Sequence, residues 1–81
     1  MRDDAIRLTL PPDPDLAAVA SVAVRAAARQ VALPEQEIDR LRAAVVEVFT
    51  AQAGVTGGPI MLVLHPDRGH LRIEVGAEIV E

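Results

Sequence analysis

The segment IMLVLHPDRGHLRIEV, residues 60–75, constrains the fold more than any other part of the chain, because two runs of alternating apolar and polar residues flank a Pro-Asp-Arg-Gly turn. Alternation with a period of two is typical of a half-buried strand, and a turn of this composition between two such runs predicts a β-hairpin. With His65 opposite His70, Leu64 pairs with Leu71 on the buried face. The same register pairs Leu62 with Ile73 and Ile60 with Val75.

The opposite face of this hairpin is less polar than a freely solvated sheet. It holds Met61, Val63, His65, His70, Arg72 and Glu74. Because Met61 and Val63 are apolar, we expect another surface to cover part of this face. A short, aromatic-poor sheet would otherwise leave apolar patches exposed, so we predict a homodimer.

The residues before the hairpin predict a strand followed by a helix. Residues 5–10 alternate as a half-buried strand does, and two prolines end the run. Asp13 is typical of an N-cap, and Pro14 takes the first position of a helix that we expect to run to about Val31. Its expected inward stripe consists of Leu16, Val19, Ala20, Ala23, Ala26, Ala27 and Val31, with Ser21, Arg25 and Arg29 on the opposite side.

A second helix is expected to begin at Glu35 and to end at Gly54, which can act as the C′ residue. Glu47 falls on the far side of its inward stripe. That stripe consists of Ile38, Leu41, Val45, Val48, Phe49 and Gln52.

The last residues, 76–81, continue the alternation of the hairpin through Ala77 and Ile79, which predicts an extension of the final strand. We therefore expect a single domain over residues 1–81. The expected fold class is α+β, a two-layer sandwich of order β-α-α-β-β, with two helices on one face of a mainly antiparallel three-stranded sheet.

Composition argues against several classes of protein. The net charge is −4 and all 8 basic residues are arginines scattered among acids, so the basic patch that a nucleic-acid-binding protein needs is missing. There is no cysteine and no run of metal ligands. The first residues, MRDDAIRLTL, are too short and too charged for a signal peptide, and no apolar run approaches the ~18 residues of a membrane span. We expect a cytoplasmic protein, and its alanine-rich, lysine-free composition is typical of GC-rich bacteria.

Candidate metal and phosphate sites are weak. His65 and His70, with Asp67 nearby, can form half of a metal site across the turn. Selective sites need three or four fixed ligands, so ordinary surface residues are the simpler interpretation. The turn at residues 57–58, Gly-Gly, can approach a phosphate, but no helix follows it to supply amide groups, which favours a simple loop. We predict no metal and no cofactor.

Three segments, IRLTLPPDPDLAAVA, LPEQEIDRLRAAVVEVFT and GGPIMLVLHPDRGHLRIEV, cover nearly the whole chain. Their content and order resemble the anti-sigma regulatory factor and serine-protein kinase group of the GHKL (histidine kinase-like) ATPase superfamily. The resemblance implies a second helix with a Glu-x-x-x-Asn box, in which the glutamate polarises the attacking group and the asparagine helps to hold Mg²⁺. Glu47 matches the glutamate, but Ala51 stands at the asparagine position and has no ligand atom.

Two further features of that family are missing from this sequence. The family's Asp-x-Gly box supplies a carboxylate for the adenine amino group and a glycine for close backbone approach, whereas Ala77 and Ile79 occupy these positions here. The sequence also ends at Glu81, before the segment that would form the nucleotide lid, so the resemblance implies a truncated and degenerate domain. Glu47 is then either vestigial or an ordinary solvated carboxylate, and we expect no catalytic, cofactor-binding or metal-binding residue.

These losses predict a non-catalytic regulatory or protein-interaction module, and the resemblance implies a sigma factor or an anti-sigma antagonist as its partner. The alternative is a weak ATP-binding protein, or a kinase-like subunit completed in trans by a partner chain. Such an enzyme would need a replacement magnesium ligand, and Gln52 is the only nearby amide, one residue out of phase. A purely structural accessory subunit is a third interpretation, which the sequence does not separate from the first.

Overall fold

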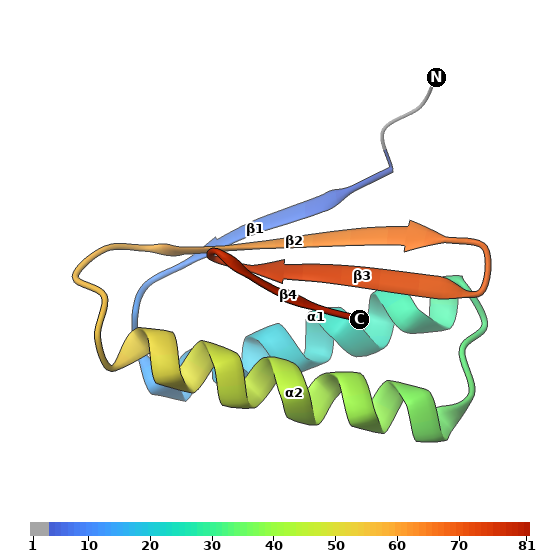
Figure 1. The fold of residues 1–81 in the computed structure, drawn as a ribbon, viewed down its shortest axis with the longest axis horizontal. Coiled ribbons are helices and arrows are strands. Elements are labelled where there is room, and N and C mark those ends of the chain that lie inside the picture. Colours follow the sequence, from blue (N-terminus) through green and yellow to red (C-terminus); the bar gives the residue numbers. More distant parts are fainter. Residues whose placement is uncertain (1–3) are drawn as a thin grey trace.

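The computed structural model describes residues 4–81; Met1, Arg2 and Asp3, which the signal-peptide argument included, lie outside the described residues. The chain forms two layers, a sheet and a pair of helices on one of its faces (Figure 1). The elements are β1 (Ile6–Leu10), the 3-10 turn η1 (Pro14–Leu16), α1 (Ala17–Gln30), α2 (Glu35–Ala53), β2 (Ile60–Asp67), β3 (His70–Val75) and β4 (Glu78–Val80).

The sheet is antiparallel and its strands lie in the order β1-β2-β3-β4. The expected two-layer α+β architecture with both helices on one face is confirmed. The expected number of strands, three, is wrong, because the described part of the chain contains four.

The additional strand arises because the chain reverses after β3 instead of continuing. Gly76 has a φ of +60°, in the left-handed region that favours glycine. Beyond this turn β4 runs back along β3, with Glu78 opposite Val75 and Val80 opposite Ile73. The expected extension of the last strand is therefore wrong. Alternation of residue types persists through a tight turn, so it did not reveal the reversal.

The β2-β3 hairpin has the expected faces but a different register. The turn consists of Arg68 and Gly69, and Gly69 adopts a φ of +67°. Asp67 therefore pairs with His70, and the expected pairing of His65 with His70 is wrong by two residues. A shift of two residues keeps every side chain on its face, so the buried set is unaffected. The observed pairs are Leu62 with Val75, Leu64 with Ile73, and His65 with Arg72.

The start of η1, which leads into α1, and the end of α1 are formed by local hydrogen bonds. The Asp13 side chain accepts a 2.9 Å hydrogen bond from the Asp15 amide, which confirms the expected cap. At the other end Ala32 adopts a φ of 56°, the Ala32 amide donates to the Arg29 carbonyl, and the Leu33 amide donates to the Ala28 carbonyl. This pair of bonds is a Schellman motif with alanine at the position that glycine usually fills.

The buried face of α1 is rotated from the one that we expected. Ser21, expected on the far side, is buried and accepts a 2.9 Å hydrogen bond from Arg42 Nε of α2. Val19, expected inward, is 45% exposed. The reason is that α1 packs against α2 as well as against the sheet, and this second contact is not visible in the periodicity of α1 alone. The buried residues of α1 are Ala17, Ala20, Ser21, Val24, Ala27 and Ala28.

The buried face of α2 agrees with the expected stripe. Val48 and Gln52 are half-buried, and the rest of the stripe is fully buried. Gly54 follows the last helical residue as expected, but its φ of −79° is right-handed, so it does not act as a left-handed C′ residue. The core between the layers is built mainly from Val24, Ile38, Leu41, Val45, Phe49, Leu62, Leu64, Ile73 and Val75.

Candidate functional site

Glu47 and Ala51 lie one helical turn apart and are both exposed on α2. Their common face points away from the core, because the stripe residues Val45 and Phe49, each two positions before one of them, are fully buried on the other side of the helix. The structure thus confirms the expected placement of Glu47 on the far side of the helix. Glu47 provides a carboxylate at these positions, and the methyl group of Ala51 provides no ligand atom.

Gln52, the nearest amide, is engaged elsewhere. Its Nε2 donates a 2.6 Å hydrogen bond to the Val75 carbonyl at the end of β3. The same carboxamide lies against Gly76, where a Cβ would overlap it. Gln52 therefore holds the β3-β4 turn against the end of α2 instead of pointing to the Glu47 face.

Ala77 and Ile79 do not converge with Glu47. Ala77 lies exposed in the β3-β4 turn. Ile79 pairs with Glu74 of β3, so its side chain lies on the sheet face opposite the helices. Glu47 and Ile79 consequently lie on opposite outer surfaces of the molecule, with α2 and the sheet between them.

His65, His70 and Asp67 are brought near one another by the hairpin but are not arranged as ligands. The ring of His65 pairs with the Glu74 carboxylate, which also lies 3.5 Å from Arg72 NH2. Asp67 Oδ1 accepts a 2.8 Å hydrogen bond from the Arg68 amide within the turn. Over residues 4–81, no group of three or more His, Cys, Asp or Glu side chains can hold a metal ion.

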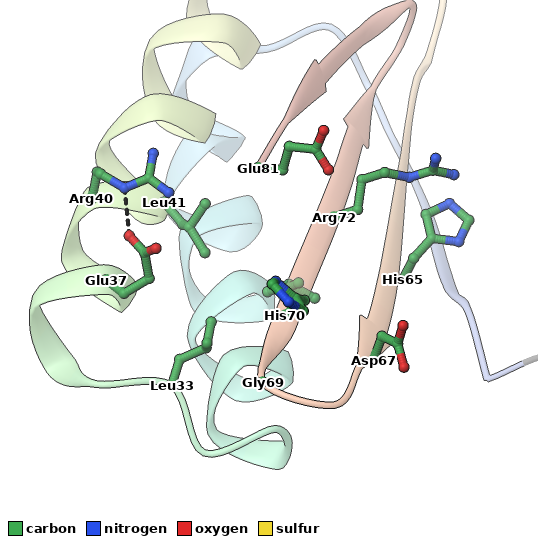
Figure 2. Close-up of a pocket in the computed structure, with 11 residues that line it drawn as sticks. Leu33, Glu37, Arg40, Leu41, His65, Asp67, Gly69, His70, Arg72 and Glu81 are labelled. Carbon is green, nitrogen blue, oxygen red and sulfur yellow. Dashed lines mark hydrogen bonds and ion pairs between the residues drawn. The ribbon is translucent and has the colours of Figure 1, made fainter.

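A polar groove of about 400 Å³ runs between the first half of α2 and the outer edge of β3 (Figure 2). It is open because β4 pairs only with Ile73, Glu74 and Val75 of β3. Figure 2 shows Glu37 and Arg40 on its helix side, with His65, Asp67 and Arg72 on its hairpin side.

The charges in this polar groove are matched in pairs. Arg40 Nε donates a 2.5 Å hydrogen bond to Glu37 Oε1, and this bond holds the pKa of Glu37 below its ordinary value. Arg72 lies beside Glu74, as described above. Because both guanidinium groups already have carboxylate partners, the polar groove does not have the excess positive charge that a phosphate group needs.

A second groove, of about 660 Å³, is mainly apolar and lies between β1 and α1. It exists because α1 packs over β2 and β3, which leaves the inner face of β1 only partly covered. Ile6 and Leu8 form its sheet side, and Ala23 and Ala26 form its helix side. Next to it, Val19 and Val22 extend the apolar surface over the outside of α1.

The sheet face opposite the helices, which we call the open sheet face, carries a third apolar area. Met61 is 50% exposed and Ile79 is 57% exposed, and Val63, which follows Met61 on the same face of β2, is half-buried. The alternation of the sequence identified Met61 and Val63. It missed Ile79, because the reversal at Gly76 brings β4 alongside β3.

Comparison of the chain with protein-family models, with curated proteins and with solved structures finds no significant match. None of the helices within residues 4–81 combines the length and the apolar character that a membrane crossing requires.

Proposed function

We propose that this chain is a non-catalytic regulatory or protein-interaction module. Its partial resemblance to the anti-sigma and serine-kinase group of the GHKL superfamily suggests a sigma factor or an anti-sigma antagonist as partner. The element order, with the two helices on one face of the sheet, is compatible with the amino-terminal part of such a fold.

The observation that carries this proposal is the exposed apolar area on the open sheet face. An antiparallel sheet that faces water usually shows polar side chains there. Here Met61 and Val63 of β2 lie on one side of Glu74 of β3, and Ile79 of β4 lies on its other side. Glu74 itself forms ion pairs with His65 and Arg72. Large apolar side chains that stay exposed beside polar groups mark a protein-binding surface.

The loss of nucleotide chemistry is supported by the positions of the vestigial residues. Ala51 offers no magnesium ligand, and Gln52 is hydrogen-bonded to the end of β3. Ala77 and Ile79 lie on different surfaces of the molecule from Glu47. A bound nucleotide would have to be held by groups that these residues do not provide.

The nucleotide part of the proposal is tested by calorimetric titration of the protein with ATP and with ADP in the presence of Mg²⁺, together with a thermal shift. A ligand that binds only the native state raises the melting temperature. We expect no heat and no shift at millimolar nucleotide. Saturable binding would contradict the proposal and would favour a weak nucleotide-binding protein or a subunit completed in trans, and its loss in Glu47→Ala would locate the site.

The interaction part is tested by cross-linking the tagged protein in cells of its native organism and quantifying the captured proteins. Met61→Asp and Ile79→Asp each place a charge in the open sheet face, and we expect both variants to lose the same partner. Val55→Asp is the matched control, because Val55 lies in the loop before β2 and is 88% exposed. A partner captured equally by all four proteins would contradict the assignment of this face.

A further inference from the structure

The outer surface of α1 carries apolar side chains that nothing within residues 4–81 covers. Val22 is 66% exposed and Val19 is 45% exposed, although α1 already buries a separate set of apolar residues against the sheet and α2. Large apolar side chains that are exposed together mark an interaction surface. Arg25 and Arg29 are also exposed and border these valines. We call this surface the outer α1 face; it consists of Ala18, Val19, Val22, Ala23 and Ala26.

The order of residues on this face is complementary to itself. The two larger side chains, Val19 and Val22, lie in its first half, and the smaller Ala23 and Ala26 lie in its second half. When two copies of the helix pack antiparallel about a point between residues 22 and 23, each valine faces an alanine of the other copy. This arrangement lets the side chains interdigitate, and it is isologous, as a two-fold dimer requires.

The charges at the two ends of the face are complementary in the same arrangement. Val22 and Arg29 are seven residues apart and project from the same side of α1, and Asp15 is exposed in η1, just before the helix begins. In the antiparallel pair, Asp15 of one copy lies near Arg29 of the other, and this occurs twice by symmetry. The positive end of each helix dipole also meets the negative end of the other.

The residues at these ends are available for such a contact. Asp15 is exposed. Arg29 pairs with Glu35 at 3.4 Å, but both side chains are more than half exposed, and pairs of this kind are weak. Arg29 can therefore turn to a second carboxylate without losing a buried contact.

We propose that a second copy of this chain docks on the outer α1 face, with the two α1 helices antiparallel. This goes beyond the proposed function, because the outer α1 face and the open sheet face lie on opposite layers of the molecule. The dimer leaves the open sheet face accessible to a different partner. A helix of 14 residues is about 21 Å long, so the helix pair covers less than the ~800 Å² per partner of a standard interface, and the dimer is expected to dissociate at micromolar concentrations.

Sedimentation equilibrium of the purified chain tests this proposal. Protein concentrations from roughly 5 to 500 µM lie on both sides of the expected dissociation constant of the dimer. We expect the mass to rise toward that of a dimer. Val22→Glu brings two carboxylates together at the two-fold axis and should leave a monomer. Val55→Glu introduces the same side chain in the loop after α2, outside the outer α1 face, and should behave as the wild type. Because Val22 is exposed, far-UV circular dichroism should show an unchanged fold in each variant.

A charge exchange tests the orientation of the helices. Asp15→Arg and Arg29→Asp each create like charges at both ends of the interface, and each should raise the dimer dissociation constant roughly tenfold. The double variant restores opposite charges and should recover most of the affinity. A monomeric wild type at 500 µM, a dimer that withstands Val22→Glu, or a double variant as weak as the two single variants would each overturn the proposal.

Discussion

The carboxamide of Gln52 occupies the space in which a side chain on Gly76 would begin. Gln52 lies in the last turn of α2, and its Nε2 donates to the carbonyl of Val75, the residue before Gly76. A Cβ on residue 76 would overlap the Gln52 Oε1 atom. Two elements that are distant in sequence thus meet at the one turn that creates β4.

Gly76→Ala is expected to destabilise the protein by about 2 to 3 kcal/mol, because it adds this overlap to the cost of a left-handed alanine. Gly69→Ala is the matched control. Gly69 has a similar φ of +67°, but no atom lies within 4 Å of its Cβ position, so only the conformational cost of about 1 kcal/mol remains. Urea unfolding of both variants measures the difference. Equal losses would mean that the contact with Gln52 has no energetic consequence.

Gln52→Ala should remove the hydrogen bond to Val75 at a cost of about 1 kcal/mol. It should also create room for a methyl group at position 76. In the Gln52→Ala background, Gly76→Ala is therefore expected to lower the free energy of unfolding only as much as Gly69→Ala does. A double-mutant cycle on the free energy of unfolding measures this coupling, and strict additivity would contradict the described contact.

Ala32→Gly should stabilise the protein by about 0.5 to 1 kcal/mol. Ala32 is exposed and holds a left-handed φ of 56°, which costs alanine more than it costs glycine. Ala43→Gly is the control, because Ala43 is exposed inside α2, where glycine should cost about 1 kcal/mol. Thermal and urea unfolding should thus show changes of opposite sign for the same chemical substitution.

The pKa of Glu37 is expected to lie below its ordinary value of 4.5, because its carboxylate accepts the hydrogen bond from Arg40. The ion pair contributes to stability at any pH above the ordinary pKa of an unfolded glutamate. That contribution is lost as the pH falls through the lowered pKa of the folded state. A carboxyl NMR titration should place the pKa of Glu37 nearer to 4.5 in Arg40→Met and leave it unchanged in Arg25→Met.

The candidate site was only partly predictable. The alternation of the hairpin placed Met61 and Val63 on an uncovered face, and the spacing in α2 placed Glu47 on the outside. Ile79 joined the open sheet face only through the reversal at Gly76, and Val22 was not recognised as part of a surface. The expected homodimer stays a prediction, and we propose its interface on α1 instead of on the sheet.

What the sequence by itself determined is local. The strand at residues 5–10, the cap at Asp13, the inward stripe of α2 and the two faces of the hairpin follow from periodicity and turn chemistry within a few neighbouring residues. Alternation is also insensitive to a register shift of two, so the faces were correct although the pairing was not.

Only the tertiary structure decided the register, the reversal that forms β4 and the buried side of α1. The pattern of α1 by itself predicted a face that is rotated from the buried one, because many of its positions are alanines. The contact with α2, including the hydrogen bond between Ser21 and Arg42, makes that selection. The reversal likewise depends on Gln52 meeting the turn at Gly76. Both contacts join residues more than 20 positions apart, beyond the reach of any local pattern.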